Sequence, residues 1–295
     1  MLVATLVSAS GQALLDDALL ASVEAIVPSI TGFFALDGAI AADLFADETD
    51  ARKLEAEIRG ALGDRPVDII VQPLATRRKR LFLADMDSTM IGQECIDELA
   101  AYVGLKDLVS AITERAMRGE IAFEPALRER VALLKGVPLA VVDEILAQKI
   151  TLSPGGRELI RTMKANGAYT ALVSGGFTAF TGPVSEKIGF DENRANILVA
   201  EDGVLTGEAA EPILGKQAKL DALVELRARF ELDPADTLAI GDGANDLAML
   251  GEAGLGVAYR AKPAVAAMAG ARLDHADLTA LLYAQGYTGE EFVRD

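Results

Sequence analysis

The chain has 295 residues, which predicts about two domains, and 51% of them are hydrophobic, enough for a buried core. The net charge of −17 argues against nucleic acid or an anionic membrane as a partner, because both require a basic protein surface. The single cysteine cannot form a disulfide within the chain, which fits the cytoplasm, and the single histidine excludes a zinc site of the HExxH type.

The N-terminal segment MLVATLVSAS resembles part of a secretory signal, but no basic residue precedes Arg52, so we predict a strand instead. Over residues 1–75 the patterns predict the order strand, helix, strand, strand, helix, strand, at 2–8, 12–27, 33–37, 39–45, 50–62 and 67–72. This order is typical of a ferredoxin-like α+β domain, a group that includes the ligand-sensing ACT domains. We therefore expect an ACT-like domain here, with regulation or formation of a homodimer as its open roles.

A boundary follows this first domain. Pro73 and the basic run Arg77-Arg78-Lys79-Arg80 favour a solvated basic linker over residues 76–80, and a nuclear-localisation signal is the weaker interpretation.

From residue 81 onward, apolar strands alternate with helices, and we predict strands at 81–85, 169–176, 237–243 and 255–259. Such continuous apolar strands are typical of a doubly wound, mostly parallel α/β sheet that helices cover on both faces. Residues 93–152 show helical periodicity in four consecutive segments, which predicts a helical cap inserted after the first strand. A hairpin is expected at 199–208, with its turn at Asp202-Gly203.

Reactive side chains follow these strands, at the sheet edge where doubly wound folds bind ligands. The first strand ends at Asp85 and Asp87, which the period of two places on one side of the strand. The other groups at this edge are a hydroxyl with glycine amides, further oxygen donors and a cation: Ser174, Gly175, Gly176, Asp242, Asn245, Asp246 and Lys219. Oxygen ligands without histidine or cysteine suit Mg²⁺, and the ion together with a lysine would neutralise a phosphoryl group.

The motifs DMDST and SGGF, Lys219 and GDGANDLAML resemble the four motifs of the haloacid-dehalogenase-like (HAD-like) phosphatases. The segments GQECIDELA and FEPALRERVALLKG extend the similarity to the phosphoserine phosphatase family. The resemblance covers about residues 81–282 and implies a HAD-like Rossmannoid core, so that the phosphatase domain would span 81–295. It also implies a phosphoric monoester hydrolase that hydrolyses O-phospho-L-serine to L-serine and phosphate, as the last step of serine biosynthesis.

The resemblance implies a role for each matching residue. Asp85 would be the nucleophile that forms an aspartyl-phosphate, and Asp87 the general acid and base. The Asp85 carboxylate, the Asp87 backbone carbonyl and Asp242 would hold Mg²⁺, with Asp246 orienting that shell. The phosphate would contact Ser174, Gly175, Lys219 and Asn245. Glu94 would bind the substrate's ammonium group and Arg130 its carboxylate, with Phe123 and Met117 lining the cap side.

Alternatives remain for several positions. Lys216 competes with Lys219, Arg128 competes with Arg130, and Glu94 and Arg130 could be surface charges or an ion pair within the cap. Cys95 suggests a cysteine phosphatase, but the arginine that such chemistry needs six positions later is absent, because position 101 is Ala101. A packed thiol is therefore expected.

Two other functions compete with phosphoserine hydrolysis. One is a HAD-like phosphatase or phosphotransferase for another small ester, such as phosphothreonine or phosphohomoserine. The other is an amino-acid-sensing regulatory protein that has kept an enzyme-like core.

Overall fold

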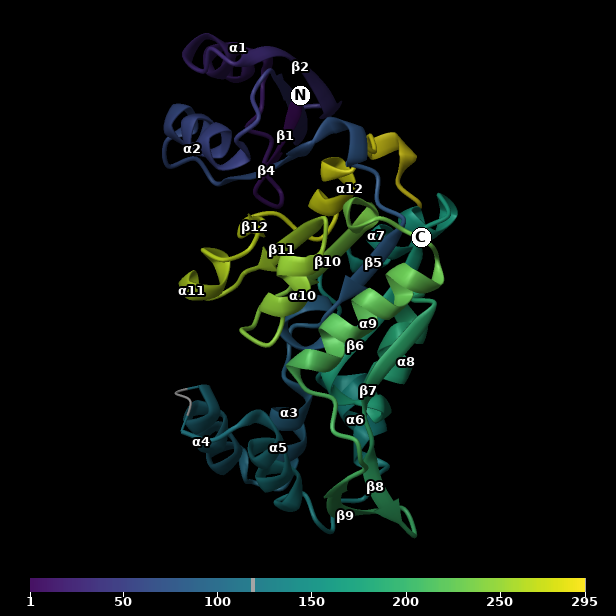
Figure 1. The fold of residues 1–295 in the computed structure, drawn as a ribbon. Coiled ribbons are helices and arrows are strands. Elements are labelled where there is room, and N and C mark those ends of the chain that lie inside the picture. Colours follow the sequence, from purple (N-terminus) through teal and green to yellow (C-terminus); the bar gives the residue numbers. More distant parts are fainter. Residues whose placement is uncertain (118–119, 295) are drawn as a thin grey trace. The chain divides into compact units, whose positions relative to one another are not determined.

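The computed structural model describes residues 1–117 and 120–294, with the side chain of Met117 outside the description. The N-terminal part forms a four-stranded antiparallel sheet in the order β2-β3-β1-β4, with two helices (Figure 1). Its elements are β1 (Leu2–Ser8), α1 (Asp17–Ile26), β2 (Ile30–Asp37), β3 (Ala41–Ala46), α2 (Ala51–Leu62) and β4 (Val67–Pro73). The predicted ferredoxin-like order is confirmed, and α1 begins later than expected because Asp16 caps it through the Leu19 N–H.

Both faces of this small sheet are buried along the central strand β1, whereas the edge strand β2 is partly exposed. One face packs against α1 and α2 through the alternate residues Leu2, Ala4 and Leu6 of the central strand β1. The residues between them, Val3 and Thr5, are also fully buried. A sheet of this kind normally leaves one face to water, so the second face has a protein cover.

A six-stranded sheet forms the centre of the remaining chain, in the order β12-β11-β10-β5-β6-β7. Its strands are β5 (Leu81–Ala84), β6 (Tyr169–Phe177), β7 (Glu192–Asn196), β10 (Thr237–Gly241), β11 (Leu255–Tyr259) and β12 (Ala271–Leu273). The pairs β6–β7, β10–β11 and β11–β12 are parallel. The predicted α/β class is therefore confirmed, and the two outermost strands, β7 and β12, are additions to the four that the sequence predicted.

Five helices lie between the strands of this part of the chain, and a sixth, α12, follows the last strand. They are α7 (Gly156–Ala165), α8 (Thr178–Ile188), α9 (Lys216–Arg229), α10 (Leu247–Glu252), α11 (Pro263–Ala266) and α12 (Ala280–Ala284). Short 3₁₀ turns occur at Leu74–Thr76, Pro234–Asp236 and Gly289–Glu291. None of the helices in the described ranges has the length and apolar character needed to cross a bilayer.

The predicted cap consists of the four expected helices, α3 (Cys95–Tyr102), α4 (Lys106–Met117), α5 (Phe123–Ala132) and α6 (Val141–Gln148). The hairpin β8 (Leu198–Glu201) and β9 (Val204–Ala209) turns at Asp202-Gly203, where both residues have positive φ. Backbone bonds join the hairpin to the cap, since the Gly136 N–H donates to Leu205 O and the Leu139 N–H to Gly203 O. The hairpin is thus fastened to the segment that precedes α6.

The chain divides into two compact units, which consist of residues 1–83, 153–170 and 223–295, and of residues 84–152 and 171–222. In the first unit, the second face of the N-terminal sheet meets the C-terminal part of the chain, where α12 contacts β1 and β3 and β12 contacts β4. The Asp68 carboxylate accepts backbone N–H bonds from Asp274, His275 and Ala276. The C-terminal segment is therefore the protein cover of that face.

The basic run at 77–80 is not a fully solvated linker. The Arg77 guanidinium donates to buried Asp43 at 2.7 Å, and Arg78 stacks on the Tyr287 ring. Lys79 is only 5% exposed and donates to the carbonyls of Thr76 and Ala235. The solvated interpretation is wrong for Arg77 and Lys79, whose cations have partners inside the same unit, whereas Arg78 and Arg80 are exposed.

Candidate active site

The first motif turns sharply after β5. Asp85 has extended backbone angles, and its Oδ1 accepts the Met86 N–H at 2.7 Å. Residues Met86–Met90 then form a tight, irregular turn, in which Asp87 has extended backbone angles and Ser88 has a φ of 54°. This left-handed conformation is rare for a residue other than glycine and is a sign of a functional constraint.

A buried ion pair joins the first and third motifs. Lys219 on α9 is 2% exposed, and its Nζ lies 2.7 Å from Asp85 Oδ2. The competing Lys216, on the first turn of the same helix, is exposed. The pairing keeps a positive charge beside the carboxylate, where a phosphoryl group would bring negative oxygens.

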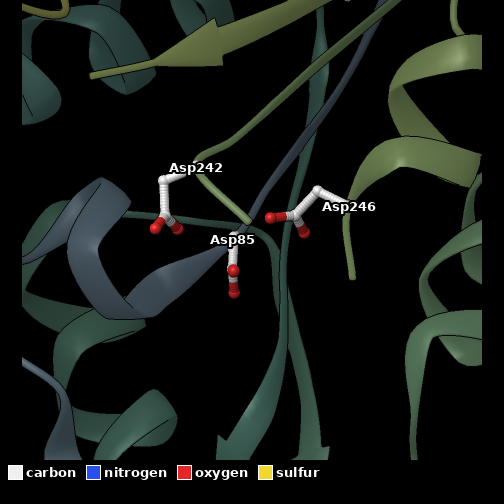
Figure 2. A group of neighbouring side chains, drawn as sticks. All are labelled: Asp85, Asp242 and Asp246. Carbon is white, nitrogen blue, oxygen red and sulfur yellow. The ribbon is translucent and has the colours of Figure 1, made fainter. Parts of the chain in front are cut away.

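Three carboxylates gather where β5 and β10 end (Figure 2). One oxygen each from Asp85, Asp242 and Asp246 lies within 4.8 Å of the other two. Three hard oxygen donors at this spacing fit a divalent cation of the Mg²⁺ type. The sequence analysis expected Asp246 to orient the metal ligands rather than to be one of them. Its carboxylate belongs to this group of three, and its Oδ2 also accepts the Gly243 N–H at 3.0 Å.

The glycines of GDGAND leave room for the polar side chains beside them. A Cβ at Gly241 would collide with the Asp246 carboxylate, and one at Gly243 would collide with the Asn245 amide. The motif therefore requires its glycines at both positions for space.

Asp87 differs from Asp85 in its surroundings. Removal from water and the nearby Glu94 carboxylate raise the pKa of Asp87 to about 7, against the opposing effect of hydrogen bonds from Cys95. The Cys95 N–H donates to Asp87 Oδ1 at 3.3 Å. Burial raises the pKa of the Cys95 thiol, so Cys95 is a packed thiol rather than a nucleophile, as the sequence predicted.

The second motif contains a local hydrogen bond between Ser174 and Gly176, and its glycine loop lies close to Asp87. Buried Ser174 accepts the Gly176 N–H through its Oγ at 2.9 Å. A Cβ on Gly176 would lie 3.0 Å from Asp87 Oδ2, and one on Gly175 would lie 3.3 Å from the Phe123 ring. Phe123 therefore reaches the glycine loop from the cap, whereas Met117 lies outside the described side chains.

Glu94 and Arg130, which we expect to recognise an amino acid, both lie in the second compact unit. Ser88 Oγ donates to Glu94 Oε1 at 2.7 Å, and desolvation raises the pKa of the Glu94 carboxyl. Arg130, a largely buried residue of α5, lies within electrostatic range of Asp97, Glu94 and Asp87. The alternative guanidinium, Arg128, is exposed and pairs with Glu211.

The sequence analysis missed one buried residue that joins two loops of the site. Asn196 is 1% exposed, and its Nδ2 donates to the carbonyls of Gly175 and Leu214 at 2.9 and 3.1 Å. Its Oδ1 accepts the Leu214 N–H at 2.7 Å. Asn196 thus fastens the glycine loop to the segment that leads into the Lys219 helix. A polar residue that closes a short strand was the only signal for it in the sequence.

A parallel α/β sheet, an inserted cap and an acidic strand edge paired with a buried lysine define a class of hydrolase. The model of the haloacid dehalogenase-like hydrolases matches residues 82–251, and the chain belongs to this family.

Within this family, curated proteins that are similar to this chain include phosphoserine phosphatases. The enzyme of Polaromonas sp. is 43% identical over 221 residues, which cover 73% of this chain and 94% of the relative. Phosphoserine phosphatase SerB2 of Mycobacterium tuberculosis is 40% identical over 240 residues and 81% of this chain, which spans only 58% of that longer protein. A solved HAD family hydrolase from Salmonella enterica serovar Typhi superposes with a TM-score of 0.85 at 29% identity, covering 97% of this chain and 99% of the other.

Proposed function

We propose that this phosphoric monoester hydrolase hydrolyses O-phospho-L-serine to L-serine and phosphate. The observation that carries the proposal is the Asp85 carboxylate, 2.7 Å from the Lys219 ammonium group and grouped with Asp242 and Asp246. The names of the similar curated proteins support phosphoserine as the substrate.

In the first step, an Asp85 oxygen attacks phosphorus while the bond from phosphorus to the serine oxygen breaks. Asp87 gives its proton to the departing oxygen, and its pKa of about 7 supports a protonated starting state near neutral pH. In the second step, water attacks phosphorus, Asp87 takes back a proton, and phosphate leaves with the Asp85 carboxylate restored.

Electrostatics must supply much of the acceleration. Enzymes speed phosphate-monoester hydrolysis by up to ~10²¹-fold, whereas one general acid contributes about 10²–10⁴-fold. Lys219, Ser174 and the Gly175 amide would bind the phosphoryl oxygens, with Asn245 at the edge of the phosphate. Asp85, Asp242 and Asp246, together with the Asp87 carbonyl, would hold Mg²⁺, which when bound adds positive charge against the phosphoryl group.

Recognition of the amino acid would use opposite charges. Glu94 would accept hydrogen bonds from the substrate's ammonium group, and Arg130 would bind its carboxylate with two parallel N–H bonds.

In a cell we place this reaction in the cytoplasm, as the last step of serine biosynthesis. We also propose the division into an ACT-like domain at 1–75, a linker at 76–80 and a phosphatase domain at 81–295.

The proposal is tested by measuring phosphate release from O-phospho-L-serine, O-phospho-L-threonine and glucose 6-phosphate. We expect phosphoserine to have the highest kcat/KM, activity to disappear after treatment with EDTA, and Mg²⁺ to restore it. Faster turnover of the sugar phosphate would overturn the substrate, and full activity in EDTA would overturn the metal.

A further inference from the structure

The position of Arg130 is set by two acceptors inside the cap. Its Nε donates to the carbonyl of Ala126, one turn earlier on α5, at 3.2 Å. Its Nη1 donates to Thr113 Oγ1 on α4, also at 3.2 Å. The guanidinium is therefore held from two different helices.

The hydroxyl of Thr113 is itself oriented. It donates to the carbonyl of Val109, on the same helix, at 3.1 Å. Since a hydroxyl has only one proton, this bond leaves lone pairs on the oxygen to accept from Arg130. Branching at Cβ restricts χ1, and the bond to the Val109 carbonyl selects the rotamer that positions the Thr113 oxygen.

Both partners of Arg130 are neutral, and this matters because carboxylates surround it. Asp97, Glu94 and Asp87 all act on the guanidinium electrostatically. A bond to any of them would use the charge of Arg130, whereas a carbonyl and a hydroxyl fix the group without neutralising it. The two contacts engage one N–H on Nε and one on Nη1, which are two of the five N–H groups of the guanidinium. The second N–H on Nη1 and the two on Nη2 take no part in these contacts. One N–H from each of these two nitrogens can therefore pair with a carboxylate.

We propose that Thr113 is a positioning residue for substrate specificity, because it holds the Arg130 guanidinium ready to bind the carboxylate of an amino-acid phosphate ester. This inference rests on the proposed function and deepens it. Thr113 would contact no substrate atom and would act only through Arg130, so its effect should depend on whether the substrate carries a carboxylate.

The test compares O-phospho-L-serine with O-phosphoethanolamine, which keeps the phosphate and the amine but has no carboxylate. In Thr113→Val, which removes the hydroxyl at nearly constant volume, KM for phosphoserine should rise about tenfold, the effect of losing one hydrogen bond to a charged group. KM for phosphoethanolamine and kcat for both substrates should change less than about twofold, because the acid–base chemistry is untouched.

Two further variants separate positioning from packing. Thr113→Ser keeps the hydroxyl and should retain the wild-type preference for phosphoserine. Arg115→Gln removes another side-chain contact between α4 and α5, the exposed pair of Arg115 with Glu129, and should leave both KM values unchanged. Thermal melting of each variant would verify that the cap remains folded.

An equal rise in both KM values for Thr113→Val, or no rise in either, would overturn the inference even with phosphoserine as the preferred substrate of the wild type. A wild-type enzyme that does not hydrolyse phosphoserine would instead overturn the proposed function, and the inference with it.

Discussion

At the scale of single residues, two aspartates two positions apart have different environments. Asp85 is paired with the Lys219 ammonium group at 2.7 Å, whereas desolvation and the Glu94 carboxylate raise the pKa of Asp87 to about 7. Opposite environments of this kind fit the nucleophile and the acid that we propose for the two positions of this motif.

Substitutions at Asp85 and Asp87 should therefore impair different steps of the reaction. We expect Asp85→Asn to abolish turnover and phosphoenzyme formation, since an amide is a poor nucleophile. Asp87→Asn should form a trace of phosphoenzyme and release it slowly, because the nucleophile remains while proton transfer is lost. Rapid acid quenching with labelled phosphoserine would measure both species, and unchanged steady-state activity in Asp85→Asn would contradict the assignment.

Lys79 provides a prediction about pH and stability. Burial lowers its pKa from 10.5 to about 8, so between these pH values the unfolded chain binds a proton that the folded chain does not. The contribution of Lys79 to the free energy of unfolding must then rise as the pH increases from about 8 to 10.5. A shift of this size corresponds to at most about 3 kcal/mol.

Urea unfolding of the wild type and of Lys79→Met at pH 7.5 and pH 10 tests this sign. The stability of the wild type relative to the variant should increase at the higher pH. The exposed Lys149, replaced in the same way, serves as the control and should give parallel pH curves. Parallel curves for Lys79→Met as well would contradict the lowered pKa.

At the level of loops and strands, the candidate site depends on hydrogen bonds that Asn196 makes to two separate loops. Replacing Asn196 by alanine leaves the carbonyls of Gly175 and Leu214 and the Leu214 N–H without their amide partner. We expect a loss of stability of about 2 kcal/mol and a fall of about 10²-fold in kcat/KM, because misplacement of about 1 Å at a reacting centre has that effect.

Asn193 on the same strand is the matched control. Its Oδ1 accepts the Thr181 hydroxyl at 2.8 Å, on a helix that carries none of the predicted site residues. Asn193→Ala should lower the melting temperature but keep kcat/KM within about twofold of the wild-type value. Equal losses of activity in both variants would show that strand stability, rather than the loop connection, is responsible.

At the scale of the whole molecule, the N-terminal sheet is integrated with the C-terminal segment rather than joined by a free linker. Gln72 donates to the carbonyl of Ala284, and the Tyr283 hydroxyl donates to Asp37, so polar contacts accompany the apolar cover of the sheet. The same compact unit contains the two ends of the chain and β10, β11 and β12.

Asp68 tests how much this integration contributes. Asp68→Ala would leave the N–H groups of Asp274, His275 and Ala276 without their acceptor, and we expect a loss of about 3 kcal/mol in unfolding free energy. KM for phosphoserine should stay the same, because these groups are not among the proposed site residues. The exposed Asp64 is the control for loss of a charge, and equal stability of both variants would contradict the prediction.

Residue patterns predicted most of the helices and strands, since apolar periodicity and turn residues act locally. The sequence predicted the βαββαβ order, the four cap helices and the turn at Asp202-Gly203, and its motifs indicated the family. Strands β7 and β12 were missed because ENRAN is short and largely polar and ARL has only three residues. Only pairing with β6 and β11 makes them strands.

Tertiary packing, and not local sequence, sets which side chains contact one another. It distinguished buried Lys219 from exposed Lys216, turned Arg128 toward Glu211, and gave Asn196 and Thr113 their partners. It also replaced a solvated interpretation of Arg77 and Lys79 with buried contacts. Burial and hydrogen bonding between segments distant in the sequence depend on packing, and local residue patterns carry little information about it.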